Sequence, residues 1–303
     1  RLQQQQQQQP QQLQLKEQQA PKQTQKVIVL PCTSSALEMI VPEANSKLPQ
    51  SDLSTSTRES RESGEIKEES VVAVDEAGRT PLMYAAGEGD AALLQHQIAM
   101  GEAVDATDEC RCTALMYAAT YGHVDTVRCL MGHGAAVEAT SKDGWTPLIT
   151  AAYNGHVGVV HCLLNMNACI EAADERGWTS LMHVAFNGDN STLRCLLEHR
   201  AQVNTLDSDG RSALVYAAFN GHVENAKCLL ECSMPPPDGS GEIPCCDGHR
   251  DTALLFAAIH GHMDVVRLLL QGATVAPETR HAAFKLAVDH GHAAVVDHLS
   301  LGK

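Results

Sequence analysis

Four cysteines recur at a constant step of 33 residues, at Cys129, Cys162, Cys195 and Cys228. Thiols can ligate a metal ion, but the ligands of one ion must lie within about 4 Å of each other. If the step marks a structural repeat, successive copies lie on the order of 10 Å apart, the spacing of packed helices. Leu268 occupies the same place in a sixth copy. We therefore interpret these cysteines as small apolar core residues rather than as a metal or redox ladder.

Another set of candidate metal ligands lies further along, where Cys232, Cys245 and Cys246 precede His249. These residues could bind zinc, but one cysteine pair and one histidine in a loop form a weak pattern compared with the spacing of structural zinc sites. A plain loop is the better interpretation. We predict no metal site and no bound cofactor.

Five histidines could suggest proton-transfer chemistry: His123, His156, His222, His262 and His292. Each follows a glycine at the same place in the repeat, so the histidines recur with the period instead of gathering at one site. No serine or cysteine nucleophile with a positioned base accompanies them, and no glycine-rich phosphate loop is present. The sequence predicts a protein that is not an enzyme.

The elements that position these residues follow from the period itself, which is best examined before any other feature. Leucine, alanine and glycine each recur with the step of 33, as Leu82, Leu115, Leu148, Leu181 and Leu214; Ala86, Ala119, Ala152, Ala185 and Ala218; and Gly89, Gly122, Gly155, Gly188 and Gly221. The next copies, Leu254, Ala258 and Gly261, follow after a step of 40. Seven residues are therefore inserted around Cys232–Cys246, and Pro235 to Pro237 predict an exposed loop there.

One copy of the repeat, residues 108–140, predicts two short helices. Thr113 is placed to cap the start of an alanine-rich helix, and Gly122 is placed to end it in a left-handed conformation. A second apolar pattern at helical spacing begins near Val124 and stops before Gly134. Two short helices cannot bury their apolar faces alone, so stacked copies predict a one-dimensional solenoid with an exposed concave face.

At this point the chain resembles the ankyrin-repeat family, on the segments DEAGRTPLMYAAGEGD, SKDGWTPLITAAYNGHVGVVHCLL and DGHRDTALLFAAIHGHMDVVRLLLQGA. The resemblance covers roughly residues 75–303 and implies an all-α ankyrin-repeat solenoid. It also implies that the repeated histidines hydrogen-bond to loop backbone. Three departures are visible: Met83 stands where the family usually has a turn-linking histidine, Arg111 and Arg250 replace turn glycines, and Arg200 replaces a glycine that ends a second helix.

Six of the eleven aromatic residues fall at two repeating places that line the concave face in ankyrin-like stacks. The turns contribute Trp145 and Trp178, and the ends of the first helices contribute Tyr121, Tyr153, Phe186 and Phe219. Aromatic rings supply large contact areas at low entropic cost. We predict that these six bind another protein, although packing against neighbouring copies is the alternative. Acidic neighbours, Glu109, Asp143, Glu175 and Asp209, favour a partner segment with basic residues.

Charge and composition limit the classes of partner. Residues 71–303 contain 14 basic and 28 acidic residues, a net charge of −14, which disfavours nucleic acid and anionic membrane surfaces. The longest apolar stretch outside the repeats is too short to span a bilayer. Cysteines used as core residues favour a reducing compartment, the cytoplasm or nucleus.

The predicted organisation has three parts. Residues 1–26 form a Gln-rich low-complexity tail and residues 27–70 a Ser/Glu-rich linker, both largely disordered. Residues 71–303 form the repeats, with boundaries near 75–107, 108–140, 141–173, 174–206, 207–246, 247–278 and a degenerate cap at 279–303. We predict a non-catalytic protein-binding scaffold or adaptor. The alternatives are the regulatory region of a larger enzyme, a kinase or ubiquitin-ligase component, and a transcriptional cofactor with a Gln-rich tail.

Overall fold

The computed structural model describes residues 74–232, 247–271 and 275–300. The predictions for the tail and the linker, and the loop predicted around Pro235, lie outside these residues. So do Cys245 and Cys246.

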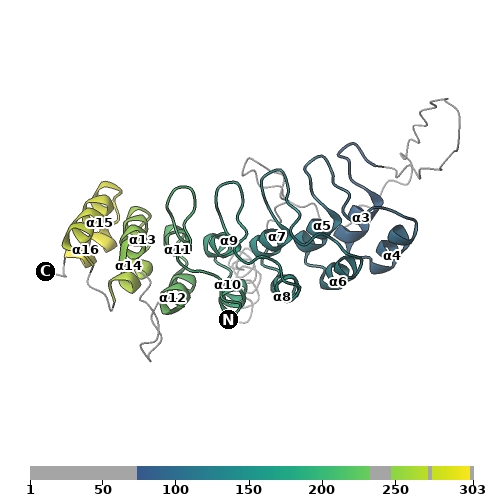
Figure 1. Cartoon of the computed structure of the whole chain (residues 1–303). Helices are drawn as coiled ribbons and strands as arrows, with labels where there is room; N and C mark the ends of the chain where they lie inside the picture. The colour runs from purple at the N-terminus through teal and green to yellow at the C-terminus, as the bar shows by residue number, and fades with distance from the viewer. Residues whose placement is uncertain (1–73, 233–246, 272–274, 301–303) are drawn as a thin grey trace, which may run out of the picture.

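The described residues form seven helix pairs that stack side by side along one axis (Figure 1). In chain order the pairs are α3 (Pro81–Glu88) with α4 (Ala91–Ala99), α5 (Ala114–Tyr121) with α6 (Val124–Gly132), α7 (Pro147–Tyr153) with α8 (Val157–Asn165), α9 (Ser180–Asn187) with α10 (Asn190–Glu198), α11 (Ala213–Phe219) with α12 (Val223–Cys232), α13 (Asp247–Ile259) with α14 (Met263–Leu270), and α15 (Pro277–Asp289) with α16 (Ala293–Ser300). The predicted all-α solenoid is confirmed.

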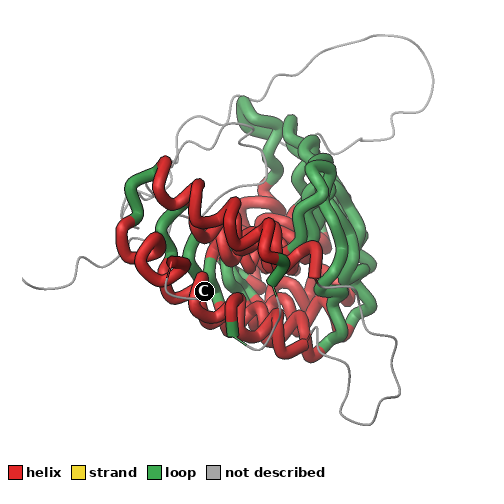
Figure 2. The backbone as a smooth tube through the Cα atoms, turned by 90° about the vertical axis from the view of Figure 1, so that its left-hand side faces the viewer, coloured by secondary structure: helices red, strands yellow, loops and turns green. Residues whose placement is uncertain are grey.

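The first helices of the pairs form one layer and the second helices form another, while the turns between units stand off to one side (Figure 2). Each first helix packs mainly against the first helices before and after it. Among the described residues, β-structure is limited to one isolated antiparallel bridge between Ala173 and Thr179. We call the surface made by the turns and the first helices the inner face.

Local sequence explains where the first helices begin and end. The hydroxyl oxygen of Thr113 accepts a hydrogen bond from the backbone N–H of Met116, as the capping prediction requires. Thr80, Thr146 and Thr179 make the same bond in their units. Gly122 ends α5 with φ at +82°, a conformation that costs glycine little because it has no Cβ.

Successive units are joined by the repeated histidines, which confirms their structural role, although the acceptors are carbonyl groups at the ends of the first helices and not loop backbone as expected. The Nε2 atom of His156 donates a hydrogen bond of 2.8 Å to the carbonyl oxygen of Thr120 in the preceding unit. The same bond recurs at four other junctions, from His123 to Gly87, His222 to Phe186, His262 to Phe219 and His292 to Ile259. In each case the imidazole lies against the glycine that ends the preceding first helix.

The fourth unit has no histidine at this place, because Asp189 stands there and caps α10 instead. The junction between α7 and α9 uses a different donor: the side-chain amide of Asn187 donates to the carbonyl oxygen of Tyr153 at 2.8 Å. One of the junctions therefore lacks the imidazole that the others share.

The core confirms the interpretation of the repeated cysteines. Cys162, Cys195 and Cys228 are buried as free thiols in the continuous apolar core, and Cys129 packs against it half-buried. The substituted turn positions also behave as expected, since Arg111 and Arg200 both adopt positive φ, at 63° and 66°.

Two predictions for the last units are wrong. Arg250 does not replace a turn glycine, because α13 begins at Asp247 and places Arg250 inside the helix. The predicted cap, residues 279–303, contains most of α15, which begins two residues earlier at Pro277, where the missing N–H of proline is tolerated. Both first helices are 13 residues long, so the expectation of short first helices fails for these two units.

The histidine contact predicts a specific cost for Gly122→Ala. A Cβ at this position would lie 2.5 Å from Nδ1 of His156, so the ring must move. Gly210→Ala is the matched control, because Gly210 has φ of +74° but an added Cβ would meet nothing within 4 Å. Both substitutions incur about 1–2 kcal/mol for a left-handed alanine, and Gly122→Ala should cost about 1–3 kcal/mol more.

Urea unfolding followed by circular dichroism measures this difference. In a His156→Ala background the extra cost of Gly122→Ala should disappear, because the clashing ring is gone. Equal costs for the two glycine substitutions in the parent chain would contradict the contact.

Candidate functional site

The turns of the inner face are organised by aspartates, three of them buried and Asp75 half-buried. In four units the aspartate Oδ1 atom accepts hydrogen bonds from the backbone N–H groups two and four residues later; these aspartates are Asp75, Asp108, Asp174 and Asp207. Such bonds hold the turn in one conformation without using backbone acceptors. The third unit has Ser141 instead, and its hydroxyl oxygen accepts the N–H of Trp145 at 3.1 Å.

The second oxygen of each aspartate ties the turn to the first helix. Tyr84 and Tyr117 donate their hydroxyl groups to Asp75 and Asp108 at 2.6 and 2.8 Å, and Tyr216 donates to Asp207. These bonds lie within one unit. Tyr84, which follows Met83, thus links the turn of its own unit to the first helix, and Tyr117 and Tyr216 do the same in theirs.

These hydrogen bonds also shift pKa values. Burial acts to raise the pKa of Asp75, but the hydrogen bonds from Tyr84 and from the Arg79 backbone and side chain outweigh it and lower the pKa to about 2. Burial and then the hydrogen bond to Asp108 raise the pKa of Tyr117. Tyr117 is therefore a neutral donor at neutral pH, and Asp75 is an ionised acceptor.

Both tryptophans immediately precede a helix-capping threonine, so the fixed turn backbone sets the direction of their side chains. The N–H of Trp178 donates to Asp174 at 2.8 Å, as the N–H of Trp145 does to Ser141. The Trp145 ring lies 5.1 Å from that of Tyr153, and the Trp178 ring lies 5.5 Å from that of Phe186, measured between centroids.

Five of the six predicted aromatic residues come together in one row. We call Tyr153, Trp145, Trp178, Phe186 and Phe219 the aromatic row. Phe186 and Phe219 stack at 6.4 Å across the junction between α9 and α11. Phe219 then reaches Phe256 at 5.9 Å, so ring contacts continue into the sixth unit.

Exposure separates the members of the row. Trp145 is only 8% exposed, so it mainly supports its neighbours. Trp178, Tyr153, Phe186 and Phe219 are half-buried. Tyr121 is 38% exposed and stands apart from the row, beside Gly87 of the first unit. Binding by the six residues remains a prediction, while their packing against neighbouring units is observed.

The residue that joins the two tryptophans, His183, was missed by the sequence analysis. Its ring lies 4.9 Å from Trp145 and 5.1 Å from Trp178. It takes the place of the repeated tyrosine, and its Nε2 atom donates to Asp174 at 3.1 Å. The break in the tyrosine pattern at this position was the available signal.

His183 is buried and electrically neutral. Burial lowers its pKa, and the hydrogen bond with Asp174 offsets this only in part. Its Nδ1 atom is buried without a hydrogen-bond partner, so a proton there would have no acceptor. Burial alone would raise the pKa of Asp174, but hydrogen bonds, first of all the one from His183, outweigh burial and lower it.

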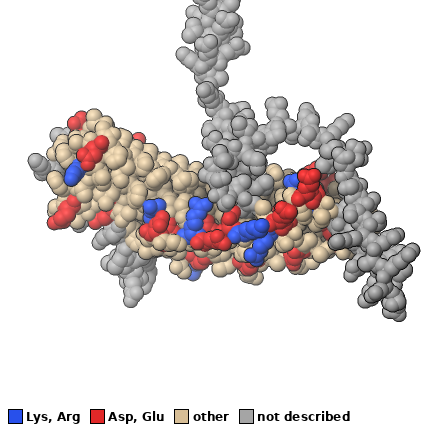
Figure 3. Space-filling model, turned by 90° about the horizontal axis from the view of Figure 1, so that it is seen from above, with Lys and Arg blue, Asp and Glu red and all other residues tan. Residues whose placement is uncertain are grey.

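The tips of the turns carry both signs of charge. Glu109, Glu175 and Asp209 are exposed, but Arg111, Lys142 and Arg176 are exposed beside them. Figure 3, which looks onto the turns, shows basic and acidic side chains next to one another on this side of the stack. The local rim is therefore less acidic than the net charge of the repeats suggests. Among the described helices, none is long and apolar enough to cross a bilayer.

The neutral His183 predicts a pH dependence of stability. The pKa of His183 is lower in the folded state than in the unfolded state. At pH values near and below its ordinary pKa of 6.5, the unfolded state therefore binds more protons than the folded state does. The free energy of unfolding should therefore decrease as the pH is lowered from about 7.5 to about 5.5. His183→Tyr, which copies Tyr84, Tyr117 and Tyr216 of other units, should reduce that fall while keeping a donor to Asp174.

Urea unfolding of both proteins at each pH checks this prediction, because the remaining histidines are common to both. The same pH dependence in the parent and in His183→Tyr would contradict it.

Comparison with known families agrees with this geometry. A family model described as ankyrin repeats in three copies matches residues 82–174 and 168–238, and a single ankyrin-repeat model matches residues 249–280. These matches cover more than half of the chain. No curated protein matches the chain. The protein therefore belongs to the ankyrin-repeat family, whose repeats are in general protein-interaction modules.

Proposed function

We propose that this protein is a non-catalytic scaffold or adaptor that binds a segment of another protein along the aromatic row. One observation carries the proposal: half-buried rings follow one another from Trp178 through Phe186 to Phe219 on the same face. Folding of a repeat needs apolar residues inside the stack, and it does not need a row of rings at the surface.

The row is suited to binding because its rings are already held in place. Trp178 packs at 4.1 Å from Tyr216, and Phe219 packs at 4.3 Å from the exposed His260. A partner that covers the open part of these rings gains apolar burial without ordering flexible side chains. Such preorganisation reduces the entropic cost of association.

Charge supports a partner segment with basic residues, but only over the longer range. The repeats carry 14 basic and 28 acidic residues, which favours the approach of a cationic segment. The turn tips supply both signs, so single ion pairs such as Arg211 with Asp209, at 3.3 Å, compete locally. Apolar contact with the row then provides most of the affinity, and charge assists the encounter.

The proposed compartment is the cytoplasm or the nucleus. Its support is the burial of free thiols at Cys162, Cys195 and Cys228, which a reducing environment preserves. As a regulatory region of a larger enzyme, or in a transcriptional cofactor, the same row would hold the partner. The binding mode does not depend on which of these contexts applies.

The row is tested with Phe186→Ala/Phe219→Ala in the full chain. Trp145 is unsuitable, because its burial means that truncation would leave a cavity. Met166→Ala is the matched control, since Met166 is 37% exposed and ends the second helix α8, away from the inner face. Circular dichroism verifies that both variants remain folded.

Proteins captured from a source lysate by the parent chain are identified by mass spectrometry, and the affinity of each candidate is then measured by isothermal titration calorimetry. The double variant should weaken binding at least about tenfold, as loss of interface hot spots does. Met166→Ala should bind like the parent. A partner that binds the double variant and the parent equally places the binding surface elsewhere and overturns the proposal.

A further inference from the structure

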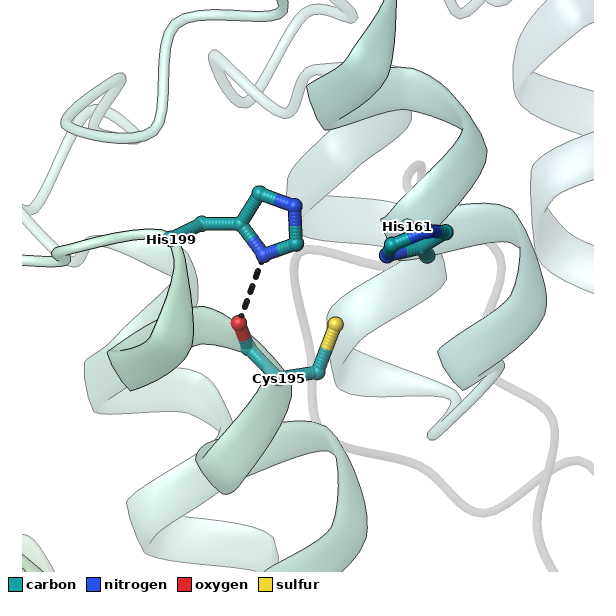
Figure 4. A group of neighbouring side chains, drawn as sticks. All are labelled: His161, Cys195 and His199. Atoms are coloured by element: carbon teal, nitrogen blue, oxygen red, sulfur yellow. Dashed lines mark hydrogen bonds between the residues drawn. The ribbon is translucent and has the colours of Figure 1, made fainter.

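Three metal-ligating side chains meet on the second-helix layer, away from the aromatic row. His161 lies on α8 of the third unit, Cys195 lies on α10 of the fourth, and His199 ends that helix. One ligand atom from each residue lies within 4.8 Å of the other two. Figure 4 shows the Cys195 thiol and both imidazole rings turned toward a common space. We propose that these three side chains bind a zinc ion that links the third and fourth units.

The orientation of His199 is set by a hydrogen bond of the kind found behind metal ligands. Its Nδ1 atom donates to the carbonyl oxygen of Cys195 at 2.9 Å (Figure 4). A neutral imidazole that is protonated at Nδ1 has its lone pair on Nε2. Bonds of this type from the second ring nitrogen to a backbone carbonyl fix the tautomer of metal-bound histidines. Nε2 of His199 is therefore held as an acceptor for a cation.

The ligand set matches the preferences of zinc. Thiolate sulfur and imidazole nitrogen are its common ligands, and in a tetrahedral site they lie about 3.3–3.8 Å apart. Atoms that lie up to 4.8 Å apart therefore need to close by up to about 1.5 Å. His161 is exposed and can rotate to do so, and its ring already meets His199 edge to face at 5.2 Å. Three protein ligands leave the fourth position to a water molecule.

Charge at the site also favours a cation. The Glu198 carboxylate acts electrostatically on the Cys195 thiol, whose pKa is raised first by burial and then by this negative charge. Binding zinc therefore releases the thiol proton to the buffer as the sulfur–zinc bond forms.

The repeat itself shows that this combination is not a by-product of the period. The place of His161 is taken by Arg128, Arg194 and Lys227 in neighbouring units. The nearest equivalent is in the second unit, where Cys129 and His133 repeat the spacing and the His133 hydrogen bond. There Gln95 occupies the third corner and its amide reaches the Cys129 sulfur at 3.9 Å. Within the described residues, three such ligands come together at the one cluster between α8 and α10.

The location of the cluster gives the ion a role. The junction between the third and fourth units is the one where Asp189 replaces the repeated histidine. A metal bound by His161 and Cys195 would connect α8 with α10 across that same junction. The ion would then link the third and fourth units through their second helices. This junction lacks the imidazole that links other units through their first helices.

Cobalt(II) substitution in the full reduced chain tests the site, because a thiolate ligand produces a sulfur-to-cobalt charge-transfer band. We expect one cobalt ion per chain, displaced by zinc. Cys195→Ser should abolish the charge-transfer band. His161→Arg and His199→Met, which copy neighbouring units, should each weaken cobalt binding at least about tenfold. Zinc should raise the unfolding midpoint of the parent chain but not that of His161→Arg.

Two control variants separate this cluster from other thiols. Cys129→Ser/His133→Met removes the second-unit equivalent, and Cys245→Ser/Cys246→Ser removes the cysteine pair near His249. Both should retain the band and the affinity of the parent. A parent chain without the band, a band that survives in Cys195→Ser, or a band lost in either control variant would overturn the proposal.

Discussion

The close fit of one helix pair against the next is the constraint on which the whole molecule depends. A single pair of helices, each of about two to three turns, has too little interior to fold alone, so stability arises at the junctions. At most junctions an imidazole lies against a left-handed glycine and donates to a carbonyl of the preceding unit. The imidazole of His156 can make this hydrogen bond only because Gly122 has no Cβ to collide with the ring. The spacing it fixes determines which side chains of adjacent units can meet.

The departures from the repeat gather around the third and fourth units. Ser141 replaces the turn aspartate, His183 replaces the tyrosine, and Asp189 replaces the junction histidine. Around these substitutions lie both tryptophans, and on the opposite layer lies the cluster of His161, Cys195 and His199. A strictly regular repeat presents similar chemistry in every unit. Residues that break the period therefore give the third and fourth units combinations of side chains that the other units lack.

The sequence was sufficient to predict the period, the helix caps and the buried cysteines, because each follows from local chemistry. Thr113 and Gly122 act within one turn of helix, and Cys162 shares its place with other apolar residues. The start of α13 was not predicted, because the residues that align with the turns of the other units lie inside this helix. The candidate site was predicted only as a set of positions. Burial of Trp145 and the isolation of Tyr121 depend on which rings face each other across a junction.

The cluster of His161, Cys195 and His199 on the second-helix layer was also not predicted from the sequence, because it forms only when two units pack together. Comparing cysteines only with cysteines led to the prediction that they share no ion, because each unit contributes one thiol to the series. His161 is separated from Cys195 by 34 residues, close to one period, so stacking brings it beside the thiol while His199 approaches along the helix. In a solenoid, residues separated by about one period or by one helical turn become neighbours. Mixed ligand sets are therefore found by searching both intervals together, with the residue types that zinc accepts.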